Sequence, residues 1–124
     1  MNKFKFESYR FENLEVWKLG MKIIHEVYKI IKKFPKEELF GLTMQLKRAA
    51  VSIVLNIVEG SGQSTSKGFA LYLHRAKSST LECVACVKIA IQENFIIEKD
   101  VELLNQLFQE EYFKIIALEK SIKK

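Results

Sequence analysis

Two cysteines three positions apart are the first residues whose spacing suits chemistry. Cys83 and Cys86 form a Cys-x-x-Cys pair, which zinc sites and thiol redox centres both use. A structural zinc site needs four ligands, and the chain has no second pair of cysteines. A redox pair would stand at a helix N-terminus beside a strand, whereas this pair lies within a helical pattern. We therefore interpret both cysteines as small buried hydrophobic residues.

Histidine and glycine patterns also fail to form a site. Di-iron bundles use Glu-x-x-His, but Lys22 precedes His25 by three positions and Leu71 likewise precedes His74. The run 60–62 (Gly-Ser-Gly) follows a helical pattern rather than a strand and lacks the lysine of a phosphate loop. We interpret the histidines as surface residues and the glycines as a turn. The sequence thus predicts no catalytic residue, metal, cofactor or small-molecule substrate, and no enzyme.

A line of polar residues interrupts an otherwise apolar helical segment. Its members are Arg48, Ser52, Asn56 and Glu59, and the first three share one face because they are four positions apart. Polar groups within an apolar helix need partners, which Glu82, Ser78 and Ser79 of the next segment could supply. We favour a hydrogen-bonded network that fixes helix register. A ligand-binding or catalytic cluster is the alternative.

A basic stripe follows the first long helical pattern. It comprises Lys18, Lys22, Lys29, Lys32 and Lys33, in a chain of net charge +5. Residues 1–62 hold 11 Lys and Arg against 7 Asp and Glu, and the remainder holds 9 against 8. A solvated helix face explains such a stripe in a single copy. If copies assemble, the stripe repeats, and its attraction for the phosphates of RNA or DNA increases.

Four amphipathic helices must position these residues. Apolar residues recur at steps of three and four over about 14–33, 38–59, 66–93 and 99–122, which predicts one all-α domain, an antiparallel up-down four-helix bundle, over 1–124. Asn13 and Ser66 are the expected N-caps and Asn94 the expected C-cap. On the last helix, Val101, Leu104, Phe108, Ile115, Leu118 and Ile122 are expected to face the core.

The first two helices are more apolar than one bundle requires. A single bundle needs an apolar stripe about 100° wide on each helix. The segment 14–33 instead carries two apolar rows, and the segment 38–59 is apolar except for the line of polar residues described above. We therefore expect a homo-oligomer that buries the surplus between subunits. The alternative is that the aromatic N-terminal tail, residues 1–12, covers it.

The chain start lacks the apolar run of a signal peptide, and no segment is a membrane span. These features predict a cytoplasmic protein that does not enter a membrane.

Several stretches resemble one bacterial family. They are Phe11 to Trp17 (FENLEVW), Phe34 to Leu42 (FPKEELFGL), Gln45 to Ile53 (QLKRAAVSI), Asn56 to Gly60 (NIVEG), and the small residues and glutamate of Ala76 to Glu82. Together they are similar to the four-helix-bundle family named for reading frames in intervening sequences of 23S ribosomal RNA genes. Val54 and Ser78 depart from it, since the family often has Pro and Gly there. A straighter second helix is expected at Val54.

The resemblance implies a homopentameric ring of four-helix bundles. It also implies kinship with the accessory proteins of diversity-generating retroelements, which bind a reverse transcriptase and its RNA. The resemblance does not imply an enzymatic activity. Our expectation is an oligomeric, non-enzymatic protein that binds RNA, DNA or a nucleic-acid enzyme through its basic surface. A purely protein-binding or structural assembly is the alternative.

Overall fold

Four long helices make up most of residues 9–122, the part of the chain that the computed structural model describes. They are α1 (Glu15–Ile30), α2 (Leu42–Ser61), α3 (Ser66–Gln92) and α4 (Glu102–Ile122). Short 3-10 helices span Arg10–Asn13, Ile31–Lys33, Lys36–Glu38 and Glu98–Val101, and no strand occurs within 9–122. The predicted all-α four-helix bundle is confirmed.

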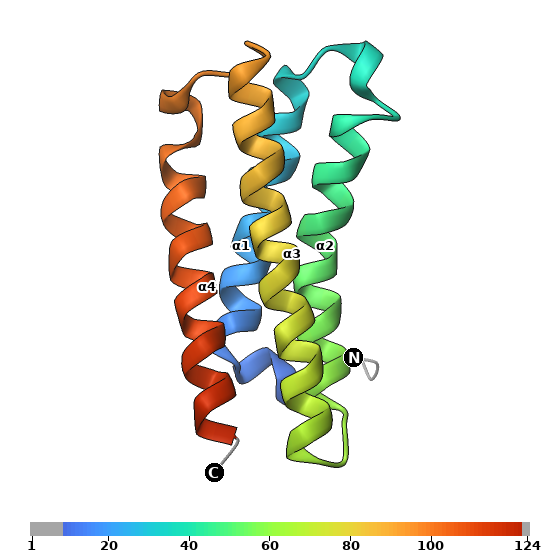
Figure 1. Ribbon diagram of the computed structural model, residues 1–124, viewed down its shortest axis with the longest axis vertical. Helices are drawn as coiled ribbons and strands as arrows, with labels where there is room; N and C mark the ends of the chain where they lie inside the picture. The colour runs from blue at the N-terminus through green and yellow to red at the C-terminus, as the bar shows by residue number, and fades with distance from the viewer. Residues whose placement is uncertain (1–8, 123–124) are drawn as a thin grey trace, which may run out of the picture.

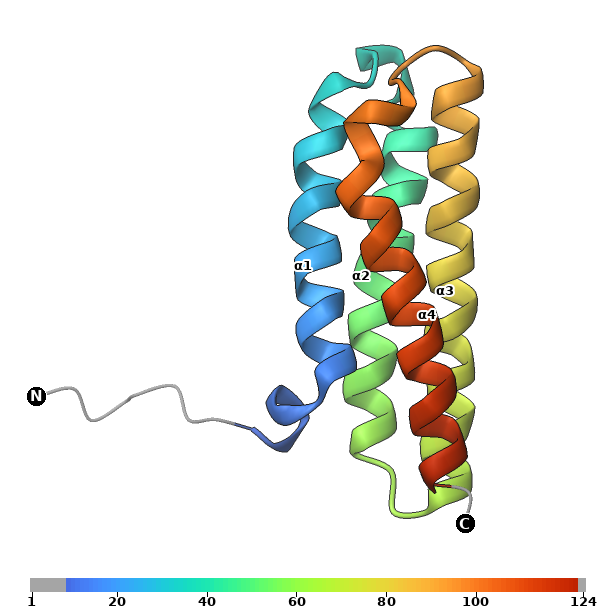
Figure 2. The same cartoon turned by 90° about the vertical axis from the view of Figure 1, so that its left-hand side faces the viewer.

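The helices run side by side along one long axis (Figure 1). Helices consecutive in the chain contact each other, and α1 also contacts α4, which closes the bundle. α2 and α4 therefore occupy diagonal corners (Figure 2). The α1–α2 and α3–α4 connections lie at one end, and the α2–α3 turn and the end of α4 lie at the other. The short connections enforce this antiparallel order.

One apolar row from each helix fills the core. The row of α1 is Val16, Leu19, Ile23, Val27 and Ile30. The larger buried side chains of the other helices include Leu46, Ile53 and Ile57 of α2, Leu73 and Val87 of α3, and Leu104, Phe108 and Ile115 of α4. The second apolar row of this segment is not equivalent, because its members range from half-buried to exposed: Leu14, Trp17, Met21, Ile24, Tyr28 and Ile31.

The start of α2 differs from the prediction. The helix begins at Leu42 rather than Glu38, because Glu38 lies in a 3-10 turn and its Oε1 accepts a hydrogen bond from the Leu42 backbone N–H at 3.0 Å. Glu38 therefore caps α2 instead of belonging to it. At the other end α2 continues to Ser61, and Gly60 stays helical against Phe69 of α3.

Other helix ends also move by a few residues. α1 gives way to a 3-10 turn after Ile30, Leu14 rather than Asn13 is its N-cap, and α4 starts at Glu102 after a 3-10 turn. Thr65, not Ser66, caps α3, because its hydroxyl accepts the Gly68 N–H at 3.0 Å.

Asn94 lies one position beyond the C-cap of α3. The C-cap is Glu93, and Asn94 adopts a left-handed conformation with φ of 64°. Asparagine tolerates this conformation better than most residues, so it turns the chain where a helix ends. The prediction of a stop here was off by one position.

The described end of the tail packs on its own bundle. Phe11 contacts Trp17 edge to face, with ring centroids 5.5 Å apart, and Tyr9 stacks on Phe11. The tail thus shields the start of α1, while exposed apolar residues remain on α2. The predicted role of residues 1–8 lies outside the described residues. Within 9–122, no helix is both long and apolar enough to cross a membrane.

Candidate functional site

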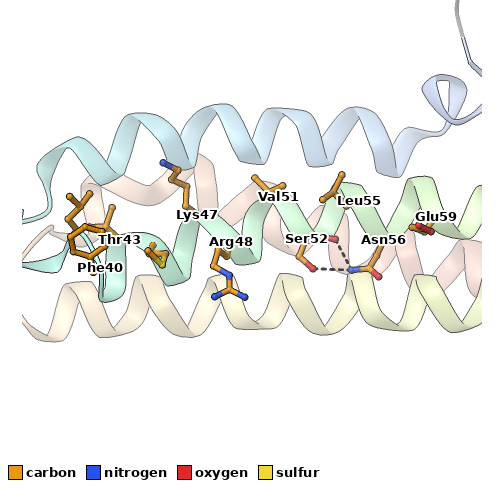
Figure 3. A pocket seen from close by; sticks show the side chains of 11 residues that line it. Phe40, Thr43, Lys47, Arg48, Val51, Ser52, Leu55, Asn56 and Glu59 are labelled. Atoms are coloured by element: carbon orange, nitrogen blue, oxygen red, sulfur yellow. Dashed lines mark hydrogen bonds between the residues drawn. The ribbon is translucent and has the colours of Figure 1, made fainter.

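The polar line on α2 divides into a bonded pair and two exposed ends. Ser52 and Ser79 of α3 are joined by a hydrogen bond of 2.9 Å between their hydroxyls. Asn56 donates through Nδ2 to the Ser52 carbonyl at 2.8 Å and to its Oγ at 2.9 Å (Figure 3). These contacts tie α2 to α3 at one register, as the structural interpretation expects for these residues.

The remaining members of the expected network lie apart from it. Arg48 and Glu59 are exposed, and neither side chain has a hydrogen-bond or ion-pair partner in the part of the chain that the structure describes. Glu82 accepts a short hydrogen bond from Nε2 of Gln45 instead. Ser78, also expected as a partner, is exposed. The network is therefore smaller than the sequence suggested, because Arg48 and Glu59 are exposed and the hydrogen bonds drawn in Figure 3 join only Ser52 and Asn56.

An apolar groove of about 640 Å³ runs along the outer face of α2. The side chains that line it are Leu39, Phe40, Thr43, Met44, Lys47, Arg48, Val51, Ser52, Leu55, Asn56 and Glu59 (Figure 3). Phe40 is 81% exposed and Leu55 is 57% exposed. Large side chains so exposed on one contiguous face are typical of interaction surfaces. This groove, hereafter the α2 groove, is the surplus apolar surface that the sequence predicts for α2.

The five predicted lysines all lie exposed along α1 and the 3-10 turn that follows it. Lys33 pairs with Asp100 at 2.9 Å, and Lys29 approaches Glu26 at 3.5 Å. The other three, Lys18, Lys22 and Lys32, have no acidic partner between residues 9 and 122.

Asp100 forms hydrogen bonds within the chain through both carboxylate oxygens. Its Oδ2 accepts the Ile97 N–H at 3.0 Å and its Oδ1 accepts from Lys33. The Ile97 backbone hydrogen bond, aided by Lys33, lowers the pKa of this carboxyl. The pair joins the α1–α2 and α3–α4 connections, so Lys33 has a structural role.

The cysteines and histidines lie where the sequence predicts. Cys83 and Cys86 are unpaired and buried, and burial is the main cause that raises the pKa of each thiol. His25 and His74 are exposed on different helices. Among residues 9–122, no group of three or more His, Cys, Asp or Glu side chains is placed to hold a metal ion.

Glu111 is a notable residue that was not predicted from the sequence. This residue of α4 is 0% exposed, and neither carboxylate oxygen has a hydrogen-bond partner among the described residues. Burial, with the charge of Glu110, raises the pKa of Glu111 to about 9, and Lys114 opposes this only in part. A signal existed, because Glu111 lies between Phe108 and Ile115 in the apolar repeat of α4.

Comparison with known proteins bears on the fold and the family. Residues 12–117 match the family model described as 23S rRNA-intervening sequence protein. The crystal structure of a protein of unknown function from the S23 ribosomal protein family of Bacteroides thetaiotaomicron is similar, with a TM-score of 0.75 and 20% identity. The alignment covers 85% of this chain and 98% of that one. No curated protein matches. The chain belongs to the 23S rRNA-intervening sequence protein family.

Proposed function

We propose that this protein is a non-enzymatic homo-oligomeric scaffold, assembled through the α2 groove, that presents the lysines of α1 to nucleic acid. The observation that carries the proposal is the groove, which exposes large apolar side chains along a whole helix. Burying one such side chain stabilises an interface by about 1.5–3 kcal/mol. The proposal places the protein in the cytoplasm, where two unpaired thiols stay reduced.

A second copy offers a surface that fits the groove. One outer row of α4 is exposed along its length and repeats at steps of three and four: Leu103, Gln106, Glu110, Phe113 and Ala117. We name this row the α4 stripe. Its two large apolar members, Leu103 and Phe113, are 52% and 64% exposed. They are ten positions apart, or about 15 Å along a helix.

The spacing and charge of the α2 groove complement those of the α4 stripe. Met44 and Leu55 are eleven positions apart on α2, or about 16 Å, so both can meet Leu103 and Phe113. Between them the groove carries Lys47 and Arg48, and the stripe carries Glu110 between its apolar ends. Opposite charges at this position favour association and register.

The two surfaces cannot meet within one molecule. α2 and α4 occupy diagonal corners, so the groove and the stripe face away from each other. A contact between them is heterologous, and such contacts repeat from copy to copy until the rotation closes a ring. The pentameric ring that the family resemblance implies is one such closed arrangement, and it is part of the proposal.

Substitution of Leu55 tests the assembly. Leu55→Glu places a charge in the groove at a position already exposed in one copy, so the bundle is expected to fold and assembly to be lost. Leu71→Glu is the matched control, because Leu71 is 49% exposed on α3 and lines neither surface. Light scattering after size exclusion measures the mass, and circular dichroism the helix content. A Leu55→Glu protein that keeps the wild-type mass would contradict the proposal.

Binding of nucleic acid is favoured by a separate observation. Lys18 and Lys22 of α1 and Lys32 of the following 3-10 turn are exposed without an acidic partner among residues 9–122. Phosphate contacts by such lysines release counterions and supply affinity that falls with salt. The resemblance implies kinship with retroelement accessory proteins, and this implied kinship favours RNA, or a reverse transcriptase that carries RNA, as the occupant of this face.

The lysines are tested by a charge-matched pair of variants. Lys18→Gln/Lys22→Gln/Lys32→Gln removes three charges from this face, and Lys67→Gln/Lys88→Gln/Lys99→Gln removes three elsewhere. We expect the first variant to bind single-stranded RNA at low salt at least tenfold more weakly than the second, with a shallower salt dependence. Equal affinities of the two variants for RNA would mean that net charge alone attracts RNA and that these three lysines have no particular role. Absence of RNA binding in the wild type would leave the assembly without this role.

A further inference from the structure

Glu111 lies at the junction of α1, α2 and α4. Its Oε2 would be 3.2 Å from a Cβ built on Gly20 of α1, and that Cβ would also be 2.7 Å from Cγ2 of Val54. Only a glycine at this position leaves room for the carboxyl beside Val54. The carboxyl is therefore fully buried and closely packed against α1, although neither oxygen has a hydrogen-bond partner among residues 9–122.

Within residues 9–122, no lysine, arginine or histidine forms an ion pair with the carboxyl of Glu111. α2 presents the apolar side chains of Ile53 and Val54, and α1 presents Gly20. On α4 itself, Lys114 bonds to Glu15 of α1 at 3.3 Å and approaches Glu110 at 3.6 Å, outside the core.

The charged groups of α3 are either exposed or, in the case of Lys77, paired elsewhere. Lys77 pairs at 2.9 Å with Glu119 of α4, two turns beyond Glu111. The thiols of Cys83 and Cys86 are buried and stay protonated, because burial raises the pKa of both. A negative charge on Glu111 would therefore be compensated only in part, by the charge of Lys114.

A proton on Glu111 and the docking of α4 are consequently linked. In the closed bundle the side chain is kept neutral, since an ionised carboxylate would lie in apolar surroundings without a partner. If α4 moves away from Gly20, the carboxyl reaches water, and its ordinary acidity returns. Lys114, three positions further along α4, then lies on the adjacent turn.

We propose that Glu111 is a proton-controlled latch that holds α4 against α1 and α2 when protonated and releases this stretch of α4 when it ionises. The equilibrium constant for the opening of α4 then increases with pH. The increase is about tenfold per pH unit in the range between the ordinary pKa of a glutamate and the raised pKa of the buried group. Between pH 6 and pH 8 the rise is about a hundredfold. The latch concerns the core of each copy and does not depend on the proposed assembly.

Amide hydrogen exchange tests the latch. Wild-type protein is compared with Glu111→Gln at each pH from 6 to 9, because the ratio of their rates cancels the intrinsic pH dependence of exchange. Glu110→Gln, one position away and exposed, is the control. For amides 104–118, we expect the exchange rate of the wild type divided by that of Glu111→Gln to increase about a hundredfold from pH 6 to pH 8. The same ratio for amides of α2 and α3 is expected to change less. Glu110→Gln is expected to follow the wild type.

A direct titration keeps the proposal testable if Glu111→Gln does not fold. The carbon-13 shift of the Glu111 carboxyl in the wild-type protein reports its ionisation. Titration near the ordinary value of a glutamate, with α4 still protected, would overturn the latch. A constant exchange ratio across the pH range would overturn it as well.

Discussion

Gly20 shows how contacts across the core dictate one residue type. In an exposed helix, alanine is more stable than glycine by about 1 kcal/mol. Here a Cβ would meet Val54 Cγ2 at 2.7 Å and Glu111 Oε2 at 3.2 Å, and a β-branched valine cannot easily move aside. The sequence gives no sign of this constraint, because it arises only where three helices meet.

We therefore predict that Gly20→Ala destabilises the bundle by about 1–3 kcal/mol through overpacking. Urea unfolding of the variant measures this change. In a Val54→Ala background, which removes the clashing methyl group, the same substitution is expected to cost far less. Equal costs in both backgrounds would show that the close approach to Val54 is not the cause.

Glu111 makes stability depend on pH. Its pKa is about 9 in the folded protein and that of an ordinary glutamate in the unfolded chain. The folded state therefore binds the extra proton, and its contribution to stability is full below about pH 4.5 and is lost as pH rises toward 9.

Wild-type stability should accordingly fall by about 1.4 kcal/mol per pH unit between pH 5 and pH 9 through this group. Glu111→Gln should remove that slope and be more stable than the wild type at pH 8. Denaturant midpoints at several pH values provide the measurement. Parallel curves for the two proteins would mean that Glu111 ionises as readily in the folded state as in the unfolded chain.

Helices were easier to predict from the sequence than their ends. The apolar repeats alone identified α1 to α4, because a period of 3.6 residues is a strong and local signal. The ends depend on individual hydrogen bonds. Glu38 has a good helix propensity, but its carboxylate accepts a hydrogen bond from the Leu42 backbone N–H and so lies outside the helix. The apolar repeat carries no information about this hydrogen bond.

The start of α3 allows a prediction about caps. Thr65 accepts the Gly68 N–H, so Thr65→Ala should destabilise the protein by about 0.5–2 kcal/mol, and Thr65→Ser should restore most of that loss. Ser66→Ala should have little effect, because Ser66 is the first residue of the helix and not its cap. Thermal unfolding of the three variants measures the difference. A larger loss from Ser66→Ala would reverse the assignment.

At the scale of the whole molecule, the surplus of apolar surface could be predicted from the sequence, but its geometry could not. An excess of apolar residues on 38–59 predicted an uncovered face, and the α2 groove provides it. Which residues of that face are exposed could not be foreseen, since the seam with α3 conceals Ser52 and Asn56 while leaving Arg48 outside. The α4 stripe was also missed, because its apolar residues are separated by polar ones.

The most direct test of the assembly mixes two variants, each with one damaged surface. Leu55→Glu damages the α2 groove and Phe113→Glu damages the α4 stripe, so each alone should be a monomer of about the 14.5 kDa chain mass. In a mixture, the intact groove of the second variant meets the intact stripe of the first. Light scattering should then detect a one-to-one heterodimer that grows no further. A mixture that stays monomeric, or single variants that keep the wild-type mass, would contradict assembly through these two surfaces.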